Sequence, residues 1–297
     1  MKPNKAEVRQ VGSIQVGAGG CWYEDWQNRN HARLFDGRHL LDAKNLIRNY
    51  ESLNDVCLLR QKVGSSRRLS LLEVGCATGE FYRYLKIRYP HASYTGVDIS
   101  GPALERARKK YPDGRFLLGN PEELLPELLK RHHVEQRPQV VYSKDVLHHQ
   151  TEPFRFLDQL IEIASESVIL RTRTRDRGPT VWDPDLSCQY HYRGWMPYIV
   201  LNLEETIDHL KDRVPTAEII AIRHRMILGG KENRFLPKDC YVPETGTAET
   251  AIGLFLNGRP GRIEVIDRSG EEASYTLSWR CRMMASRLFR WREGARA

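Results

Sequence analysis

A glycine-containing turn is the first segment of this sequence whose residue types and spacing could do chemistry. Residues 71–81 read LLEVGCATGEF, an apolar run followed by a tight turn and the start of a helical pattern. Gly75 lets a ligand approach the backbone closely, and Gly79 lets a helix begin against the turn. A strand, a turn and a helix in this order are typical of a site for an adenine nucleoside or a dinucleotide.

Two carboxylates narrow the choice of ligand. Asp98 ends the next apolar run, 98 − 73 = 25 residues after Glu73. This is near the offset expected for a carboxylate that binds ribose hydroxyls, although Asp98 could instead cap the helix that Gly101 and Pro102 open. The spacing G-x-A-x-G is one residue shorter than the dinucleotide fingerprint. Glu73 would repel a pyrophosphate, whereas it would attract the ammonium group of S-adenosylmethionine.

Four segments together resemble class I S-adenosylmethionine-dependent methyltransferases, in particular those that methylate oxygen on small molecules. LLEVGCATGEF is similar to their first motif and YTGVDIS to their second. FLLGNPEEL is similar to the adenine-binding segment after the third strand, and VVYSKDVLHHQ to the segment after the fourth. The resemblance carries specific motifs over residues 67–175 and extends more loosely to residue 256.

The resemblance implies roles for individual residues at the cofactor. Asp98 would bind the ribose hydroxyls, and Ile99 would pack on the adenine. Asn120 would contact the adenine amino group, at a position where the family usually has aspartate. Pro121 departs from the family pattern, because proline has no N–H to donate there. The other cofactor-binding residues that the resemblance implies are Glu73, Gly75, Cys76, Ala77, Gly79, Ser143 and Lys144.

Two adjacent histidines follow the predicted fourth strand, in the segment that reaches the transferring methyl group in this family. Methylation of a hydroxyl needs a base to take its proton, and histidine has a suitable pKa. We expect His149 to be this base, with His148 as the alternative. Asp145 would orient a histidine or the acceptor. A histidine here can also be a structural residue that holds the loop.

Arginines alternate where the predicted fifth strand ends. Alternation with period two places Arg171, Arg173 and Arg175 on one face, where they would bind a carboxylate or phosphate. Alternatively, these arginines bind no ligand and lie at a strand end that is exposed to solvent. Tyr192 and Trp195 belong to an aromatic stretch that suits stacking on a sugar or base, or packing as a lid. We therefore expect a small anionic acceptor, such as an acidic sugar, another saccharide or a phosphorylated metabolite.

The elements that must position these residues alternate between strand and helix. This rhythm predicts an α/β fold with a Rossmann-like, doubly wound sheet that is mostly parallel, and the resemblance implies seven strands. Residues 172–200 read as an irregular stretch. The predicted strands are 69–74, 94–97, 116–118, 140–143, 168–171, 217–228 and 249–256, with a hairpin of 262–265 and 275–280; the predicted helices are 81–89, 102–111, 121–131, 153–164 and 203–211.

Composition divides the chain into three regions. Residues 1–66 would form an N-terminal arm and helical cap, and residues 67–260 the Rossmann-like domain, with 172–200 as a substrate lid. Residues 261–297 would form a C-terminal extension with a β-hairpin and a basic amphipathic helix. The segment 279–292 is both basic and apolar, so it would contact either an anionic membrane surface or the domain itself.

Overall composition sets the class of protein. Hydrophobic residues make up 40% of the 297 residues and charged residues 28%, which excludes general disorder and a collagen-like chain. The net charge of +8 favours anionic partners but also suits ordinary solubility. The six cysteines lack metal-ligand spacing, so we expect no metal site. With no apolar signal segment or membrane span, we expect a cytoplasmic protein, peripheral to the inner face of a membrane if the tail is a tether.

These features together predict an enzyme that transfers a methyl group from S-adenosylmethionine to an acceptor oxygen and yields S-adenosylhomocysteine. Two alternatives stay open. The basic charge and the aromatic–arginine stretch permit an RNA-modifying methyltransferase, and the cofactor motifs permit a non-catalytic S-adenosylmethionine-binding protein. The shortened glycine spacing disfavours a nicotinamide dehydrogenase.

Overall fold

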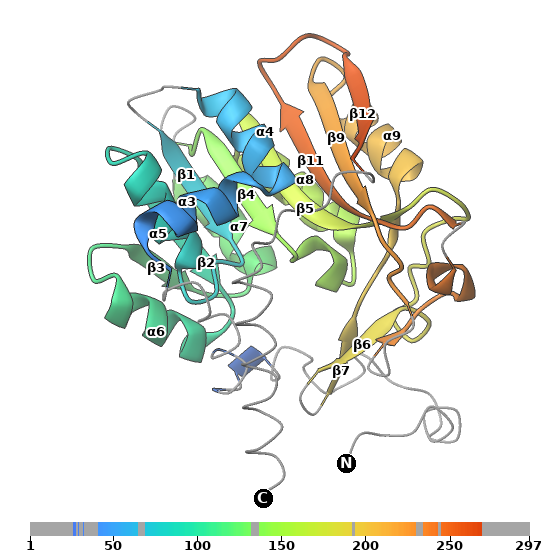
Figure 1. The fold of residues 1–297 in the computed structure, drawn as a ribbon, viewed down its shortest axis with the longest axis horizontal. Coiled ribbons are helices and arrows are strands. Elements are labelled where there is room, and N and C mark those ends of the chain that lie inside the picture. Colours follow the sequence, from blue (N-terminus) through green and yellow to red (C-terminus); the bar gives the residue numbers. More distant parts are fainter. Residues whose placement is uncertain are drawn as a thin grey trace, which may run out of the picture.

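The protein has the α/β architecture predicted from its sequence (Figure 1). The computed structural model describes residues 26–27, 29, 32, 41–64, 69–131, 137–191, 194–229, 234–242 and 245–268. In these residues nine strands form one sheet with the order β12-β9-β11-β5-β4-β1-β2-β3, and β8 pairs with β5. The strands are β1 Ser70–Val74, β2 Ser93–Asp98, β3 Arg115–Leu118, β4 Val140–Lys144, β5 Ser167–Arg175, β8 Leu201–Asn202, β9 Glu218–Arg225, β11 Ala248–Phe255 and β12 Ile263–Asp267.

Five neighbouring strands, from β3 to β5, run parallel. Parallel neighbours need crossover helices, and four helices supply them: α5 Glu80–Arg88, α6 Gly101–Lys110, α7 Pro121–Arg131 and α8 Pro153–Ile163. β11 is antiparallel to both β5 and β9. The seven strands from β3 to β9 are the predicted mostly parallel sheet. β12 extends it, because it pairs in parallel with β9; the predicted hairpin partner at 275–280 lies outside the described residues.

Helices cover both faces of the sheet. Adjacent side chains of a strand point to opposite faces, so Leu71 and Leu72 of β1 enter two different apolar cores. The first core is closed by α5, α6 and two helices before the sheet, α3 Ala43–Glu51 and α4 Asn54–Val63. The second is closed by α7, α8 and α9 Leu203–Arg213. Figure 1 shows the first group in front of the sheet and the second behind it.

Part of the stretch 172–200, expected to be irregular, is regular structure. β5 continues to Arg175, and the aromatic residues that follow form β6 Cys188–His191 and β7 Gly194–Pro197. With β10 Arg234–Phe235 they make a three-stranded antiparallel sheet, order β10-β6-β7. This small sheet lies below the main sheet in Figure 1, at the edge where the parallel strands end. The prediction of an irregular stretch was wrong here, because aromatic residues favour strands.

None of the helices in the described part of the chain is both long enough and apolar enough to cross a bilayer.

Candidate cofactor and methyl-transfer site

The glycine turn lies where the order of the parallel strands reverses. β1 has β2 on one side and β4 on the other, and open α/β sheets bind ligands in the crevice outside the carboxyl ends of the strands at such a point. Gly75 and Gly79 have φ angles of 85° and 75°. A Cβ atom on Gly75 would lie 2.2 Å from Cγ2 of Val146, in the loop after β4. Because residue 75 is a glycine, the loop after β1 and the loop after β4 can lie against each other.

Asp98 lies beside this turn at the end of β2. Its carboxylate is 8% exposed and accepts hydrogen bonds from the N–H groups of Ala77, at 2.7 Å, and Ser100, at 2.8 Å. Burial raises the pKa of Asp98, and these N–H donors oppose the rise. The N-cap of α6 is Ser100 rather than Asp98, because the Ser100 hydroxyl accepts from Ala103 N–H. The carboxylate thus keeps acceptor capacity for a further hydroxyl.

Glu73 points into the protein. It is 5% exposed, and its carboxylate accepts a hydrogen bond from the Tyr94 hydroxyl. Burial raises the pKa of Glu73 to about 8, against the opposing effects of the Tyr94 hydrogen bond and the Lys144 charge. Cys76 is also buried, at 4% exposure, and burial raises the pKa of its thiol. Both side chains support the turn from within the domain.

Asn120 and Pro121 start α7. The Asn120 side-chain oxygen accepts from Glu122 N–H at 3.2 Å, and its carbonyl accepts from Leu124 N–H at 2.9 Å. Pro121 is the first residue of α7, where a missing N–H costs nothing because that group has no partner within the helix. The departure from the family pattern therefore has a local structural reason. Asn120 and the half-buried Ile99 follow neighbouring strands at the same edge.

Two residues near the N-terminus, which the sequence analysis did not select, reach this edge. The Gln27 side chain donates to the carbonyl of Ile99 at 2.6 Å and accepts from Gly101 N–H at 3.1 Å. The Trp26 ring meets the His149 ring edge-on, with centroids 5.6 Å apart. Residues 26 and 27 thus link the loop after β2 to the loop after β4. No local pattern could reveal contacts across more than 70 residues of sequence.

His149 is held in a defined orientation in the 3-10 turn Leu147–His149. Its Nδ1 atom lies 2.8 Å from the carbonyl oxygen of Pro197 at the end of β7. A carbonyl only accepts hydrogen bonds, so Nδ1 carries the hydrogen and Nε2 is the basic nitrogen of the neutral ring. The ring also contacts the edge of Tyr198, at 5.6 Å between centroids.

His148 is in a different environment. It is 2% exposed, and its Nδ1 lies 3.5 Å from the Thr172 hydroxyl oxygen. Burial, assisted by neighbouring His149 and Arg173, holds the pKa of His148 well below its usual value. A side chain that is both sealed and difficult to protonate is poorly suited to exchange protons with an acceptor. Ser143, just upstream, donates its hydroxyl to the carbonyl of Val74 and ties β4 to β1.

The three arginines of β5 form ion pairs with carboxylates. Arg171 Nη1 lies 3.2 Å from Glu249, and Arg173 Nη1 lies 2.9 Å from Glu249 and 3.2 Å from Asp145. Arg171 also binds Asp145, whereas Arg175 pairs separately with Asp239. The arginines share a strand face but do not form one clamp.

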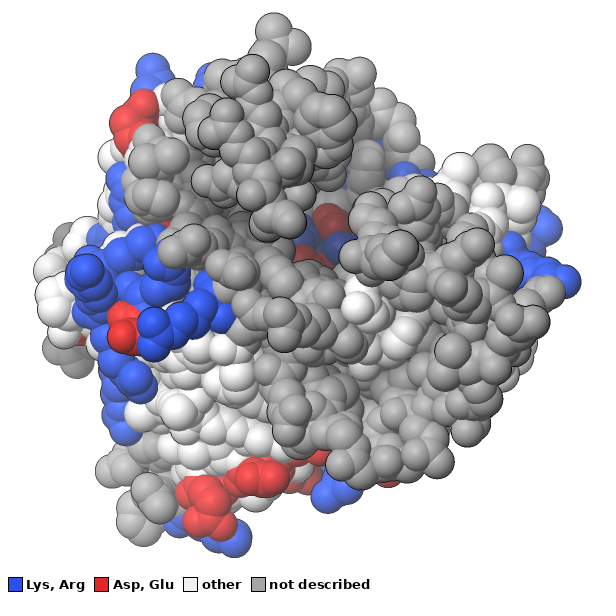
Figure 2. All heavy atoms as spheres, turned by 90° about the horizontal axis from the view of Figure 1, so that it is seen from below, with Lys and Arg blue, Asp and Glu red and all other residues white. Residues whose placement is uncertain are grey.

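Among the described residues, Asp145 pairs with arginines and not with a histidine. With Arg171, Arg173 and Glu249 it forms an ion cluster at the end of β5. Burial would raise the pKa of Asp145, but Arg171 and Arg173 hold it well below its usual range. Asp145 forms no hydrogen bond or ion pair with a histidine in the described ranges, and it has a φ of 59°. The face shown in Figure 2 has a central hollow with charged side chains of both signs at its bottom.

Tyr198 and Arg234 stand next to this cluster. Arg173 Nε donates to the Tyr198 hydroxyl at 3.2 Å, and the Arg234 guanidinium lies 4.3 Å from the Tyr198 ring centroid. Arg234 comes from β10, which no motif predicted. Trp195 packs edge-on against Tyr190 at 5.5 Å, on the small sheet. Tyr192 and the segment 279–292 lie outside the described residues.

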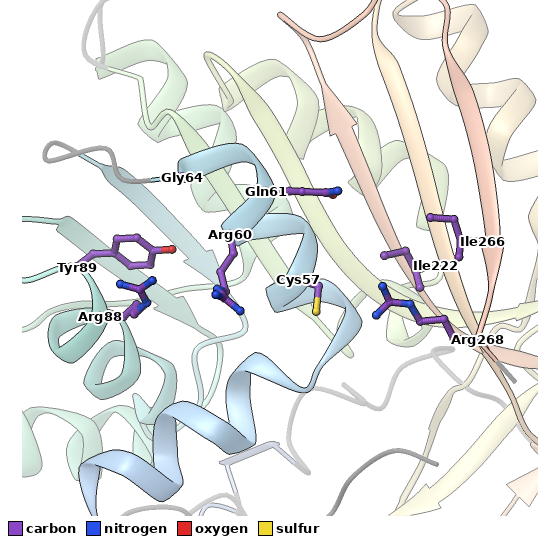
Figure 3. Close-up of a pocket in the computed structure, with 9 residues that line it drawn as sticks. All are labelled: Cys57, Arg60, Gln61, Gly64, Arg88, Tyr89, Ile222, Ile266 and Arg268. Atoms are coloured by element: carbon purple, nitrogen blue, oxygen red, sulfur yellow. The ribbon is translucent and has the colours of Figure 1, made fainter. Parts of the chain in front are cut away.

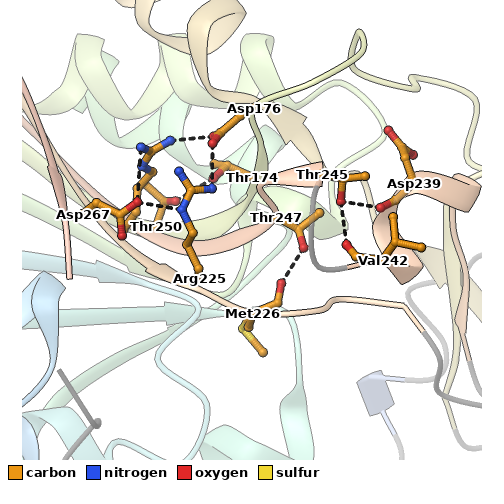
Figure 4. Close-up of polar contacts among 11 residues, drawn as sticks. Thr174, Asp176, Arg225, Met226, Asp239, Val242, Thr245, Thr247, Thr250 and Asp267 are labelled. Atoms are coloured by element: carbon orange, nitrogen blue, oxygen red, sulfur yellow. Dashed lines mark hydrogen bonds and ion pairs between the residues drawn. The ribbon is translucent and has the colours of Figure 1, made fainter. Parts of the chain in front are cut away.

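A second ion network lies further along the same strands. Arg225 donates to Asp176 at 2.7 Å and to Asp267 at 2.6 Å, and Arg223 donates to Asp176 at 2.6 Å (Figure 4). Two arginines and two aspartates balance in charge, so this network explains how the ends of β5, β9 and β12 are held together.

A cavity of about 420 Å³ lies away from the predicted site (Figure 3). Arg60 and Cys57 of α4 border it, together with Ile222 of β9 and Ile266 of β12. Arg60 lies 3.3 Å from Glu51. No residue predicted to bind cofactor or acceptor lines this cavity, so the chemistry above does not depend on it.

Known proteins resemble the central part of the chain. Residues 72–169 match a family model described as a methyltransferase domain. A demethylmenaquinone methyltransferase of Thermotoga maritima is 39% identical over 54 residues, which cover 18% of this chain and 24% of that protein. A trans-aconitate 2-methyltransferase of Enterobacter sp. (strain 638) is 30% identical over 106 residues, 36% of this chain and 39% of that protein. The chain thus spans less than half the length of these curated relatives.

One solved structure supports the fold over a longer range. Phosphoethanolamine N-methyltransferase 2 of Haemonchus contortus, in complex with S-adenosyl-L-methionine, has a TM-score of 0.50. It is 11% identical and covers 80% of this chain and 60% of that chain, which is a likeness of fold alone. The glycine turn, Asp98 and the strand order agree with the family match. Residues 72–169 therefore match a methyltransferase domain, and the order of the strands agrees with this match.

Proposed function

We propose that this protein transfers a methyl group from S-adenosylmethionine to an oxygen atom of a small anionic acceptor, with His149 as the base. The hydrogen bond between His149 Nδ1 and the Pro197 carbonyl carries this proposal. It fixes the tautomer whose Nε2 can take a proton, at the end of the loop that follows β4.

The residues around the glycine turn fit the cofactor. Gly75 and Gly79 supply a turn without side chains at the strand switch point, and Asp98 supplies a carboxylate for the ribose hydroxyls. Ile99 and Asn120 would border the adenine. When bound, S-adenosylmethionine supplies a methyl group on a sulfonium sulfur, which keeps the electron pair of the broken S–C bond.

His149 would act on the acceptor. Its Nε2 takes the proton of an acceptor hydroxyl as the oxygen forms its bond to the methyl carbon, so charge and protons balance. Trp26 and Tyr198 both contact the imidazole and hold its orientation. A positioned base contributes typically 10²–10⁴-fold, and alignment of the reactants supplies much of the rest.

The charge of the whole chain supports an anionic acceptor. Its net charge is +8, although Asp145 and Glu249 balance the charges of Arg171 and Arg173 themselves. The name of the Enterobacter relative, trans-aconitate 2-methyltransferase, points to acids as acceptors. Acidic sugars and phosphorylated metabolites are further members of the same chemical class.

Calorimetric titration with S-adenosylhomocysteine tests the cofactor part of the proposal. Wild-type protein is expected to bind saturably, and Asp98→Asn to bind more weakly, because an amide accepts one fewer strong hydrogen bond than a carboxylate. Asp113→Asn, a change in an exposed loop, is the matched control. No binding by the folded wild-type protein would overturn the proposal. Methyl transfer is then measured with a panel of acidic sugars, di- and tricarboxylates and sugar phosphates.

An RNA acceptor is the second candidate. Figure 2 shows Lys and Arg side chains gathered at the left of this face, where α6 lies, and the last turn of α6 contains Arg108, Lys109 and Lys110. Binding through such a surface would weaken steeply as salt is raised. RNA binding with that salt dependence, together with methyl transfer to RNA, would favour this candidate over a small acceptor.

A further inference from the structure

Arg234 differs from the other arginines of this region in its partners. The other arginines of this region have carboxylate partners: Arg171 and Arg173 share Asp145 and Glu249, and Arg175 pairs with Asp239. Within the described part of the chain, no carboxylate forms an ion pair with Arg234. The hydrogen bonds of Arg234 go to neutral oxygens, those of Gln189 at 3.0 Å and Leu228 at 3.1 Å.

These contacts hold the guanidinium but leave part of it unused. They engage Nε and Nη1, and the face of the group lies on the Tyr198 ring. Nη2 makes no hydrogen bond to a described residue, so it has two hydrogens that it can donate to a ligand.

The group is also costly to keep charged. Burial lowers the pKa of Arg234, and the charge of Arg173 acts in the same direction, while Tyr198 and Asp145 oppose it. A partly buried cation whose charge is not fully balanced is unfavourable, and an anion that binds to it relieves the cost while forming charge-assisted hydrogen bonds. Arginine suits carboxylate and phosphate groups in particular, because its donors form a planar fork.

The position of Arg234 connects it to the proposed base. Tyr198 contacts Arg234 through its ring face and forms a T-shaped pair with the His149 ring, so both groups contact the same aromatic ring. We infer that Arg234 binds the anionic group of the acceptor and sets its distance from the oxygen that is methylated beside His149. This inference rests on the proposed function, and it adds the residue that selects the acceptor.

Binding of small anions to the S-adenosylhomocysteine-loaded protein tests the inference. Malonate serves as the carboxylate probe and inorganic phosphate as the phosphate probe, with calorimetry as the measurement. We expect one of them to bind saturably and Arg234→Gln to weaken that binding at least about tenfold, the loss expected for a charge-assisted hydrogen bond. Arg259→Gln, at an exposed position, should leave it unchanged. The probe that binds identifies the chemistry of the anionic group.

Two results would overturn the inference: equal anion affinity in wild type and Arg234→Gln, or no binding of either probe. Titration of Arg234→Gln with S-adenosylhomocysteine separates this failure from that of the proposed function, because an intact variant retains the cofactor affinity of wild type. If the variant does not fold, NMR on wild type decides. Saturation with the bound anion should raise the pKa of His149, since a negative charge nearby favours imidazolium. If the pKa of His149 did not change when the anion binds, that result would contradict the inference.

Discussion

The Nδ1 atom of His149 and the carbonyl oxygen of Pro197 lie 2.8 Å apart, although 48 positions separate them in the chain. This contact joins the loop after β4, which belongs to the methyltransferase domain, to the end of β7, which belongs to the small antiparallel sheet. The small sheet therefore does not only lie beside the main sheet. Its Pro197 carbonyl sets the tautomer of the side chain that we propose as the base.

Replacement of His149 tests that role directly. His149→Asn is expected to lower turnover by roughly 10²–10⁴-fold, the contribution of a positioned base, while S-adenosylhomocysteine binds as in wild type. The measurement is the rate of methyl transfer to the acceptor found in the panel, with calorimetry for the cofactor. His209→Asn is the matched control, because His209 pairs with Asp158 on another part of the surface. Wild-type turnover in His149→Asn would assign the base to another group.

The turn at Gly75 offers a test of the cofactor crevice. Gly75→Ala places a methyl group on a residue with φ of 85° and within 2.2 Å of Val146, so the loops after β1 and β4 must move apart. We expect S-adenosylhomocysteine affinity to fall at least about tenfold, the effect of 1.4 kcal/mol. Gly64→Ala carries the same kind of strain, with φ of 54°, but meets nothing within 4 Å.

Calorimetry on the two glycine variants separates backbone strain from the crevice. Gly64→Ala is expected to lose some thermal stability and to keep its cofactor affinity. If both variants bound the cofactor as wild type does, the turn after β1 would not be the cofactor site.

Much of the domain was predictable because its signals are local. Parallel strands buried on both faces give short apolar runs, and the crossover helices give helical spacing between them. The turn at Gly75 and the carboxylate at Asp98 follow directly from the ends of β1 and β2. The sequence therefore places these residues at one edge without any knowledge of distant contacts.

The acceptor side was less predictable because its contacts are distant in sequence. Alternation places Arg171 and Arg173 on one face, but Glu249 reaches them only because β11 pairs with β5. Arg175 meets Asp239 across 64 positions, and Trp26 reaches His149 from near the N-terminus. Arg234 gains its importance from what surrounds it in space, which no motif records.

The ion cluster around Arg171 should be important for stability. Arg171→Met leaves Asp145 and Glu249, whose side chains are 31% and 24% exposed, with one fewer cation. Breaking a fully buried pair costs about 3–5 kcal/mol, and the loss at this partly buried site should approach that range. Arg171 is 8% exposed, so solvent cannot replace it. Arg262→Met is the control, because the Arg262 side chain is 39% exposed and its surface pairs should contribute about 0–1 kcal/mol.

Denaturant unfolding of both variants measures these costs. The expected result is a large drop in the unfolding midpoint for Arg171→Met and a small one for Arg262→Met. Equal small losses would mean that Asp145 and Glu249 are satisfied without Arg171, and that the arginines of β5 are available to the acceptor.

Glu73 predicts a specific dependence of stability on pH. Its pKa rises from 4.5 to about 8 on folding, because burial disfavours the carboxylate. Between these values the folded protein holds a proton that the unfolded chain has lost, so the free energy of unfolding decreases as pH rises through this window. Glu73→Gln keeps an oxygen that can accept from Tyr94 but removes the titration. The variant is therefore expected to melt at a higher temperature than wild type at pH 9, with the difference shrinking towards pH 5.

Glu264→Gln, whose side chain is 39% exposed, should show no such trend. Melting curves of the three proteins across this range make the comparison, and a difference that does not change with pH would show that Glu73 is ionised in the folded protein throughout.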